Sequence, residues 1–120
     1  MVKVMALKKA YRIKANKEFQ HMFQHGSSFA NRQLVLYYIK KSEQTHFRIG
    51  LSVGKKIGNA VTRNRIKRHL REAFRELESR VSPVYDLIII ARKPTRRMDY
   101  NGVKKSLIHL LSKEKLLSKK

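Results

Sequence analysis

The sequence predicts an α+β fold, a two-layer sandwich in which helices pack on a small sheet in the order α-β-β-β-α-β-α. Three segments carry apolar residues at helical spacing, and strand-length runs of β-branched and aromatic residues lie between them. The chain has 120 residues, 42% of them hydrophobic, which suits one domain with a modest core. We expect that domain at residues 16–112. An irregular basic arm should precede it at 1–15, and a disordered basic tail should follow at 113–120.

The first helix is expected at about residues 17–25. Asn16 is a good N-cap, and Gly26 stands directly after the segment, where glycine commonly ends a helix. Apolar side chains follow the cap at helical spacing, namely Phe19, Met22 and Phe23.

Three strands should follow, at residues 27–30, 34–39 and 47–53, with a hairpin loop at 40–46 between the last two. In the third run, apolar residues alternate with small or polar ones. Because successive side chains of a strand point to opposite faces, one face of this sheet should be packed and the other open to a ligand.

A long helix is expected from Asn59, its N-cap, to about Ser79, with Thr62 as a rival cap. Its apolar stripe consists of Ile66, Leu70, Ala73, Phe74 and Leu77. The continuous apolar run at 86–91 is typical of a strand covered on both faces. Asp99 should cap a last helix, whose apolar face consists of Val103, Leu107, Leu110 and Leu111.

The formal net charge of +21 points to a polyanionic partner, because self-repulsion of this size destabilises a compact chain. Nucleic acid is the first candidate, and a charge that serves only solubility is an alternative. An anionic membrane is another, but it calls for an amphipathic basic helix or a lipid anchor. No run approaches the ~20 apolar residues of a membrane span. The chain has no cysteine, so a disulfide framework is excluded and a cytoplasmic location is expected.

Charge is distributed unevenly along the long helix. Between Glu43 and Glu72 there is no acidic residue, and the first half of the helix holds five basic ones: Arg63, Arg65, Lys67, Arg68 and Arg71. This opposes the helix dipole, at about 0.3–1 kcal/mol for each charge. A bound phosphate would reverse the effect, and glycines at 54 and 58 would let it approach the backbone. The alternative is a solvated basic face.

Aromatic residues on the sheet and first helix favour RNA or single-stranded nucleic acid, whose bases stack on rings. The candidates are Phe19, Phe23 and Tyr37, and the alternative for each is core packing. No catalytic set is evident. Glu72 and Glu76 form a helical surface pair, and His21 and His25 lack a third metal ligand.

The segment from Gly54 to Arg71 resembles the RNR signature of the bacterial ribonuclease P protein subunit. The resemblance extends over about residues 9–111. It includes Tyr11-Arg-Ile13, the pattern Asn16…Phe19…Phe23…Gly26, Ala30-Asn-Arg-Gln33 and Ile89-Ile-Ala-Arg-Lys-Pro94.

The resemblance implies a left-handed β-α-β crossover and a chain that is one subunit of an endoribonuclease. In that enzyme a catalytic RNA, with Mg²⁺, hydrolyses precursor tRNA to give the mature 5′ end. The protein itself would supply no catalytic residue, cofactor or metal site. Its partners would be ribonuclease P RNA and precursor tRNA, with no membrane, and it would be a monomer within the holoenzyme. A general RNA-binding or ribosome-assembly protein is the alternative.

Two groups of residues follow from the resemblance. Those expected to contact the ribozyme are Lys55, Lys56, Asn59, Arg63, Asn64, Arg65, Lys67, Arg68 and Arg71. Those expected to contact the 5′ leader of the substrate are Phe19, Phe23, Tyr37, Arg12, Lys17, Asn31 and Arg32.

Overall fold

The structure, a computed structural model, describes residues 11–118. In this range the helices are α1 (Asn16–His25), α2 (Ala60–Glu76) and α3 (Tyr100–Lys113). The strands are β1 (Ser27–Ala30), β2 (Leu34–Lys40), β3 (Arg48–Ser52) and β4 (Tyr85–Ala91). Two short 3-10 helices, η2 (Lys55–Ile57) and η3 (Lys93–Arg97), precede α2 and α3. The predicted fold class and element order are confirmed.

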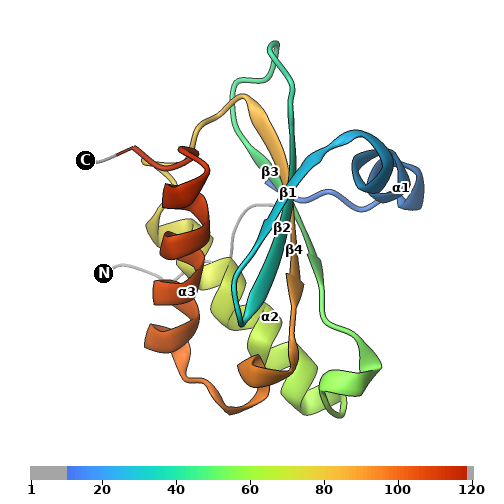
Figure 1. The fold of residues 1–120 in the computed structure, drawn as a ribbon, viewed down its shortest axis with the longest axis vertical. Coiled ribbons are helices and arrows are strands. Elements are labelled where there is room, and N and C mark those ends of the chain that lie inside the picture. Colours follow the sequence, from blue (N-terminus) through green and yellow to red (C-terminus); the bar gives the residue numbers. More distant parts are fainter. Residues whose placement is uncertain (1–10, 119–120) are drawn as a thin grey trace, which may run out of the picture.

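The four strands form one sheet in the order β1-β2-β4-β3. The pairs β1–β2 and β2–β4 are antiparallel, whereas β3 and β4 are parallel and α2 connects them. This connection is the one for which the family resemblance implies a left-handed crossover. Figure 1 shows the sheet edge-on, with α2 and α3 on one face and α1 on the other.

The predicted hairpin at 40–46 was wrong. This loop joins β2 to β3, and β4 lies between those two strands. The physical reason lies in β4, where Leu87, Ile88 and Ile89 are all fully buried. A strand that is apolar on both faces is most stable in the interior of a sheet, so it separates its two predecessors.

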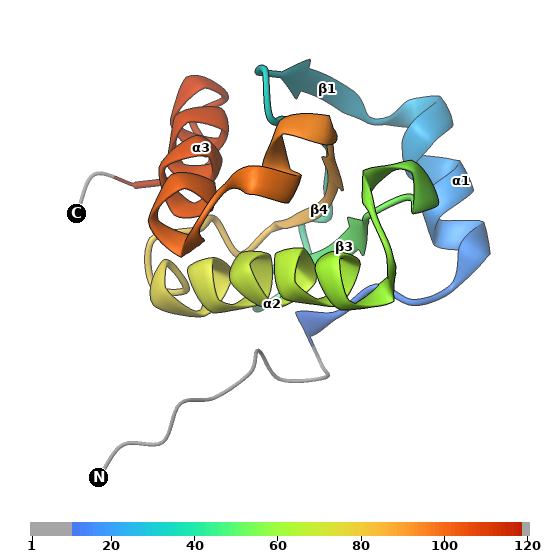
Figure 2. The same ribbon diagram turned by 90° about the horizontal axis from the view of Figure 1, so that it is seen from below.

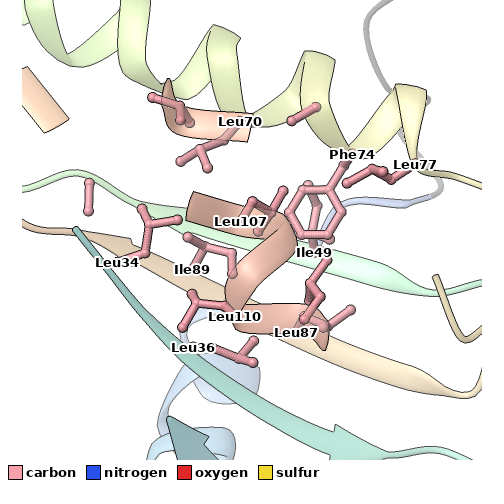
Figure 3. Packing of buried hydrophobic residues seen from close by; sticks show 14 of the residues in the cluster. Leu34, Leu36, Ile49, Leu70, Phe74, Leu77, Leu87, Ile89, Leu107 and Leu110 are labelled. Carbon is pink, nitrogen blue, oxygen red and sulfur yellow. The ribbon is translucent and has the colours of Figure 1, made fainter. Parts of the chain in front are cut away.

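The main core lies between the sheet and the pair α2 and α3 (Figure 3). The predicted stripes of both helices are buried in it, with no side chain more than 3% exposed. Across from them the sheet contributes Leu34, Leu36, Ile49, Leu87 and Ile89, as Figure 3 shows. Helical periodicity therefore located this half of the fold correctly.

Two of the three predicted helix caps are present. The side chain of Asn59 accepts a hydrogen bond from the Thr62 amide at 2.9 Å, and Asp99 accepts one from Gly102 at 2.9 Å. The Asn16 cap was wrong, because Ala15 occupies that position without a side-chain hydrogen bond. Gly26 does follow α1, but with φ −81° it is not left-handed. A Cβ there would lie 2.9 Å from the Tyr38 carbonyl oxygen, so close backbone packing requires this glycine.

Both predicted tails are shorter than expected. The Ile13 amide donates to the Ile49 carbonyl at 2.7 Å, and the Ile13 side chain is only 5% exposed. At the other end Leu116 and Leu117 are buried, and Leu117 bridges to Val81. The segment around Ile13 pairs with the free edge of β3, and the segment around Leu117 pairs with the connection after α2. The folded domain therefore extends beyond 16–112. Residues 1–10 and 119–120 of the predicted tails lie outside the described range.

The Asn59 cap gives a first testable result. We expect Asn59→Ala to lower the free energy of unfolding by about 1 kcal/mol, because the Thr62 amide loses its acceptor. Asn59→Asp retains an acceptor and should unfold at nearly the wild-type urea concentration. An equal loss in both variants would show that capping is not the reason.

Candidate nucleic-acid interface

The face of the sheet that carries α1 is only partly covered. On this face Gly50 lets α1 pack closely against β3, because a Cβ at position 50 would lie 2.5 Å from Cζ of Phe19. The glycine that the sequence pattern assigned to an open face thus has a packing function. Beneath α1 a small second core joins Ile13, Met22 and Ile88.

The three predicted aromatic residues come together beside this second core. The ring centroids of Phe19 and Phe23 are 6.3 Å apart and those of Phe23 and Tyr37 are 5.0 Å apart, both in edge-to-face geometry. Phe19 and Tyr37 are half-buried, whereas Phe23 is 39% exposed. Phe19 therefore combines a packing role with partial exposure, and Phe23 offers most of the surface on which a base could stack.

An ion-pair cluster holds α1 on the sheet. Arg48 donates to both carboxylate oxygens of Asp86, at 3.0 and 2.6 Å, and to Glu18 of α1 at 3.0 Å. These hydrogen bonds are the main reason that the pKa of Arg48 is raised. This ion-pair cluster was not predicted from the sequence. The signal was a single acid, Asp86, inside an otherwise apolar strand.

The predicted ribozyme-contacting residues of α2 lie along its first half and the turn before it. Lys55, Lys56, Asn64 and Arg68 are exposed. Two arginines are oriented by backbone contacts. Arg63 donates to the Gly58 carbonyl at 3.0 Å, and Arg65 donates to the Arg96 carbonyl at 2.7 Å.

The contact between Arg65 and Arg96 brings in a basic segment that the sequence analysis left out of the site. Segment η3 touches both η2 and α2, and Figure 2 shows these elements close together. Its exposed cations, Lys93, Arg96 and Arg97, extend the basic surface of α2. A signal was available. Parallel strands end at the same edge of a sheet, so the β-α-β crossover implied by the resemblance places the segments after β3 and β4 side by side.

Farther along α2, a pocket of about 180 Å³ has four cationic side chains in its lining: Arg12, Lys14, Lys67 and Arg71. Burial, and then the charge of Arg12, lower the pKa of Arg71. Arg12 therefore lies beside Lys67 and Arg71 of α2, and its predicted contact with the leader stays a prediction. Lys17, by contrast, is exposed in the first turn of α1.

Asn31 was predicted as a leader contact, but its side chain is used inside the fold. Its Oδ1 accepts hydrogen bonds from the amides of Gln33 and Leu34, at 3.0 and 2.8 Å. Its Nδ2 donates to Ser106 Oγ at 3.0 Å, which ties the β1–β2 turn to α3. The exposed Arg32 next to it shares this turn, so the structure does not bring either residue into the aromatic group.

Acidic side chains are nearly all engaged within the protein. In residues 11–118, every one except Glu43 forms an ion pair or accepts a hydrogen bond. Glu72 pairs with Arg75, and Glu76 accepts from Lys104 and Tyr100, as expected for a surface pair. No group of three or more potential metal-ligating side chains lies together in this range. Nor does any described helix have the length and apolarity to cross a membrane.

His69 provides a test of the charge on α2. Burial, and then the charges of Arg65 and Arg68, lower its pKa below the usual value of 6.5. The unfolded chain therefore binds a proton at His69 more tightly than the folded protein does. The folded state keeps its full stability above pH 6.5, where His69 is neutral, and loses part of it as the pH falls through the folded-state pKa of His69. We expect the melting temperature of His69→Gln to fall less than that of the wild type between pH 7.5 and 5. Equal pH dependence would contradict this, and His25→Gln on α1 serves as the control.

Comparison with known proteins agrees with this geometry. Residues 7–115 match the profile of the family described as Ribonuclease P. The chain is 67% identical over 111 residues to the ribonuclease P protein component of Oceanobacillus iheyensis, covering 92% of each chain. The Staphylococcus aureus RNase P protein has a similar structure, with a TM-score of 0.85, 46% identity and coverage of 92% of this chain and all of that one. For the Thermotoga maritima RNase P protein the values are 0.78 and 30%, over 85% and 96% of the two chains. The chain therefore belongs to the bacterial ribonuclease P protein family.

Proposed function

We propose that this chain binds ribonuclease P RNA through the basic face of α2 and the 5′ leader of precursor tRNA through the open sheet face beside α1. The observation that carries this proposal is the pairing of two surfaces of different chemistry. One is a helix whose first twelve residues include five cations and no acid. The other is an aromatic group that α1 and β2 form on the partly covered face of the sheet.

Each surface suits its proposed ligand. Folded RNA presents a dense array of phosphates, which arginines bind through two parallel hydrogen bonds. A single-stranded leader exposes its bases, and these stack on rings with little dependence on sequence. Family membership supports both assignments. It is also the reason to prefer them over a general RNA-binding or ribosome-assembly function.

The proposed reaction is hydrolysis of precursor tRNA that leaves a 5′ phosphate on the mature tRNA. Catalysis is assigned to the RNA subunit together with Mg²⁺, which would activate the attacking water and stabilise the leaving oxygen. The side chains of this protein would act by position and charge. They would hold the leader and reduce the repulsion between two RNA chains, as a monomeric subunit of a cytoplasmic holoenzyme.

Reconstitution tests the proposal. Bacterial ribonuclease P RNA is assayed for cleavage of precursor tRNA at low Mg²⁺, with and without the protein. We expect the protein to raise the cleavage rate and to bind this RNA more tightly than an unrelated structured RNA of equal length. No increase, with folded protein and RNA that is active at high Mg²⁺, would overturn the proposal. Equal binding of both RNAs would favour a general RNA-binding protein.

The aromatic group allows a second, independent test. We expect Phe23→Ala and Tyr37→Ala to weaken binding of precursor tRNA to the holoenzyme by about tenfold, since stacking is worth ~1–3 kcal/mol per base. Substrates that have only a one-nucleotide leader should be unaffected, and affinity for ribonuclease P RNA should stay near the wild-type value. A loss that is independent of leader length would show that the ligand of this group is not the leader.

A further inference from the structure

Three exposed residues, one directly before η2 and two in the first turn of α2, have no polar or charged side chain. They are Gly54, Ala60 and Val61, and we call them the entry strip. They lie among the cations of η2 and α2, where every other exposed side chain is polar or charged.

Gly54 has no reason within the described protein to be glycine. Its φ of −73° and ψ of 163° are open to any residue, and a Cβ built there would meet no atom within 4 Å. This differs from Gly26 and Gly50, where a Cβ would overlap a backbone carbonyl or the ring of Phe19. A larger residue at 54 would restrict the unfolded chain and so favour the folded state. The fold therefore does not require glycine at position 54. Glycine is common where a ligand approaches the backbone closely.

Val61 is equally unexplained by folding. Its side chain is 75% exposed, and the other exposed large hydrophobic residue of the described chain is Phe23, in the aromatic group. A β-branched residue is also not favoured in a helix, because the preceding turn restricts its side-chain rotamers. Neither helix formation nor core packing calls for valine at this position.

We propose that the entry strip is a van der Waals contact surface for riboses of ribonuclease P RNA, while the cations around it hold the neighbouring phosphates. An RNA backbone alternates charged phosphates with uncharged riboses. A surface that places bare backbone and one apolar side chain among cations matches that alternation. The inference rests on the proposed function, because it takes this RNA as the partner.

The test compares Gly54→Val and Val61→Ala with the wild type in binding to ribonuclease P RNA over a range of salt concentrations. Ser112→Val adds similar bulk at an exposed position near the end of α3 and serves as the control. We expect Gly54→Val to weaken binding about tenfold by blocking close approach. Val61→Ala should weaken it roughly three- to tenfold by removing apolar contact. The slope of log affinity against log salt should not change, since no phosphate contact is lost. Melting temperatures should not fall, and the control should bind like the wild type.

The possible outcomes distinguish a failure of the entry-strip inference from a failure of the proposed function. If the wild type does not bind ribonuclease P RNA specifically, both are overturned. If the wild type binds and both variants bind equally well, only the entry strip is overturned. A weaker affinity that accompanies a lower melting temperature, or a reduced salt slope, also counts against it. If binding of the RNA is unchanged but binding of precursor tRNA is weakened, the strip contacts the substrate and the assignment to ribonuclease P RNA is wrong.

Discussion

Replacing Arg48 with methionine is expected to lower the free energy of unfolding by about 3–5 kcal/mol, the largest effect on stability that the fold predicts. The side chain of Asp86 is 2% exposed, and Arg48 donates to both of its carboxylate oxygens. Without the guanidinium group, an uncompensated charge is left in an inner strand of the sheet. A loss of this size is a large share of the ~5–15 kcal/mol by which domains are stable, and it should lower the melting temperature by roughly 10–20 °C.

Two further variants make this result specific. Arg75→Met removes the partner of Glu72 in a solvent-exposed pair and should destabilise the protein far less than Arg48→Met. The double variant Arg48→Met with Asp86→Leu removes both charges of the pair, including the buried carboxylate, and should recover much of the stability. Urea denaturation of the four proteins measures each effect. If Arg48→Met costs no more than Arg75→Met, the buried carboxylate does not depend on Arg48.

Replacing Arg65 and Arg68 together with alanine should have the largest effect on RNA binding. Two charge-assisted contacts to phosphates, each worth ~1.5–3 kcal/mol, correspond to at least a hundredfold loss of affinity for ribonuclease P RNA. The salt slope should fall by about one to two units, because fewer counterions are released. Folding should change little, since both charges oppose the helix dipole and Arg65 has only one exposed hydrogen bond.

A matched control keeps the net charge equal. Lys105→Ala with Lys113→Ala removes two exposed cations from α3 and should weaken binding much less. Filter binding or fluorescence anisotropy at several salt concentrations compares the two double variants. Equal losses would indicate that the RNA responds to net charge alone. An unchanged slope in the arginine variant would count against phosphate contact.

Elements with a strong local pattern could be predicted from the sequence. The stripes of α2 and α3, the caps at Asn59 and Asp99 and the buried strand β4 each rest on residues within a few positions of one another. The aromatic group also followed, because Phe19 and Phe23 lie one turn apart on α1. Tyr37 was a candidate because it lies in the aromatic run of β2. Family resemblance then supplied the assignment of the group to the leader.

Features that join distant segments could not be predicted in this way. Strand order is not encoded in the periodicity of any one strand, so β4 was not placed between β2 and β3. Ile13 is a single apolar residue in a basic segment, and it becomes part of the core only because the edge of β3 is free. Asn31 has the composition of a surface turn, and its contacts to α3 span 75 residues. Local pattern carries no information about such partners.

The connection between α2 and β4, residues 77–84, holds both ends of the described chain. Tyr11 donates a hydrogen bond to Glu78, and the Ser118 amide donates to the Arg80 carbonyl at 2.8 Å. This connection therefore contacts both ends of the described chain, and limited proteolysis can test how far their order depends on it. One cut there would weaken the contact of Tyr11 with Glu78 and the pairing of Leu117 with Val81 in the same event. Loss of order at the two ends, although they are more than a hundred residues apart in sequence, should then occur together.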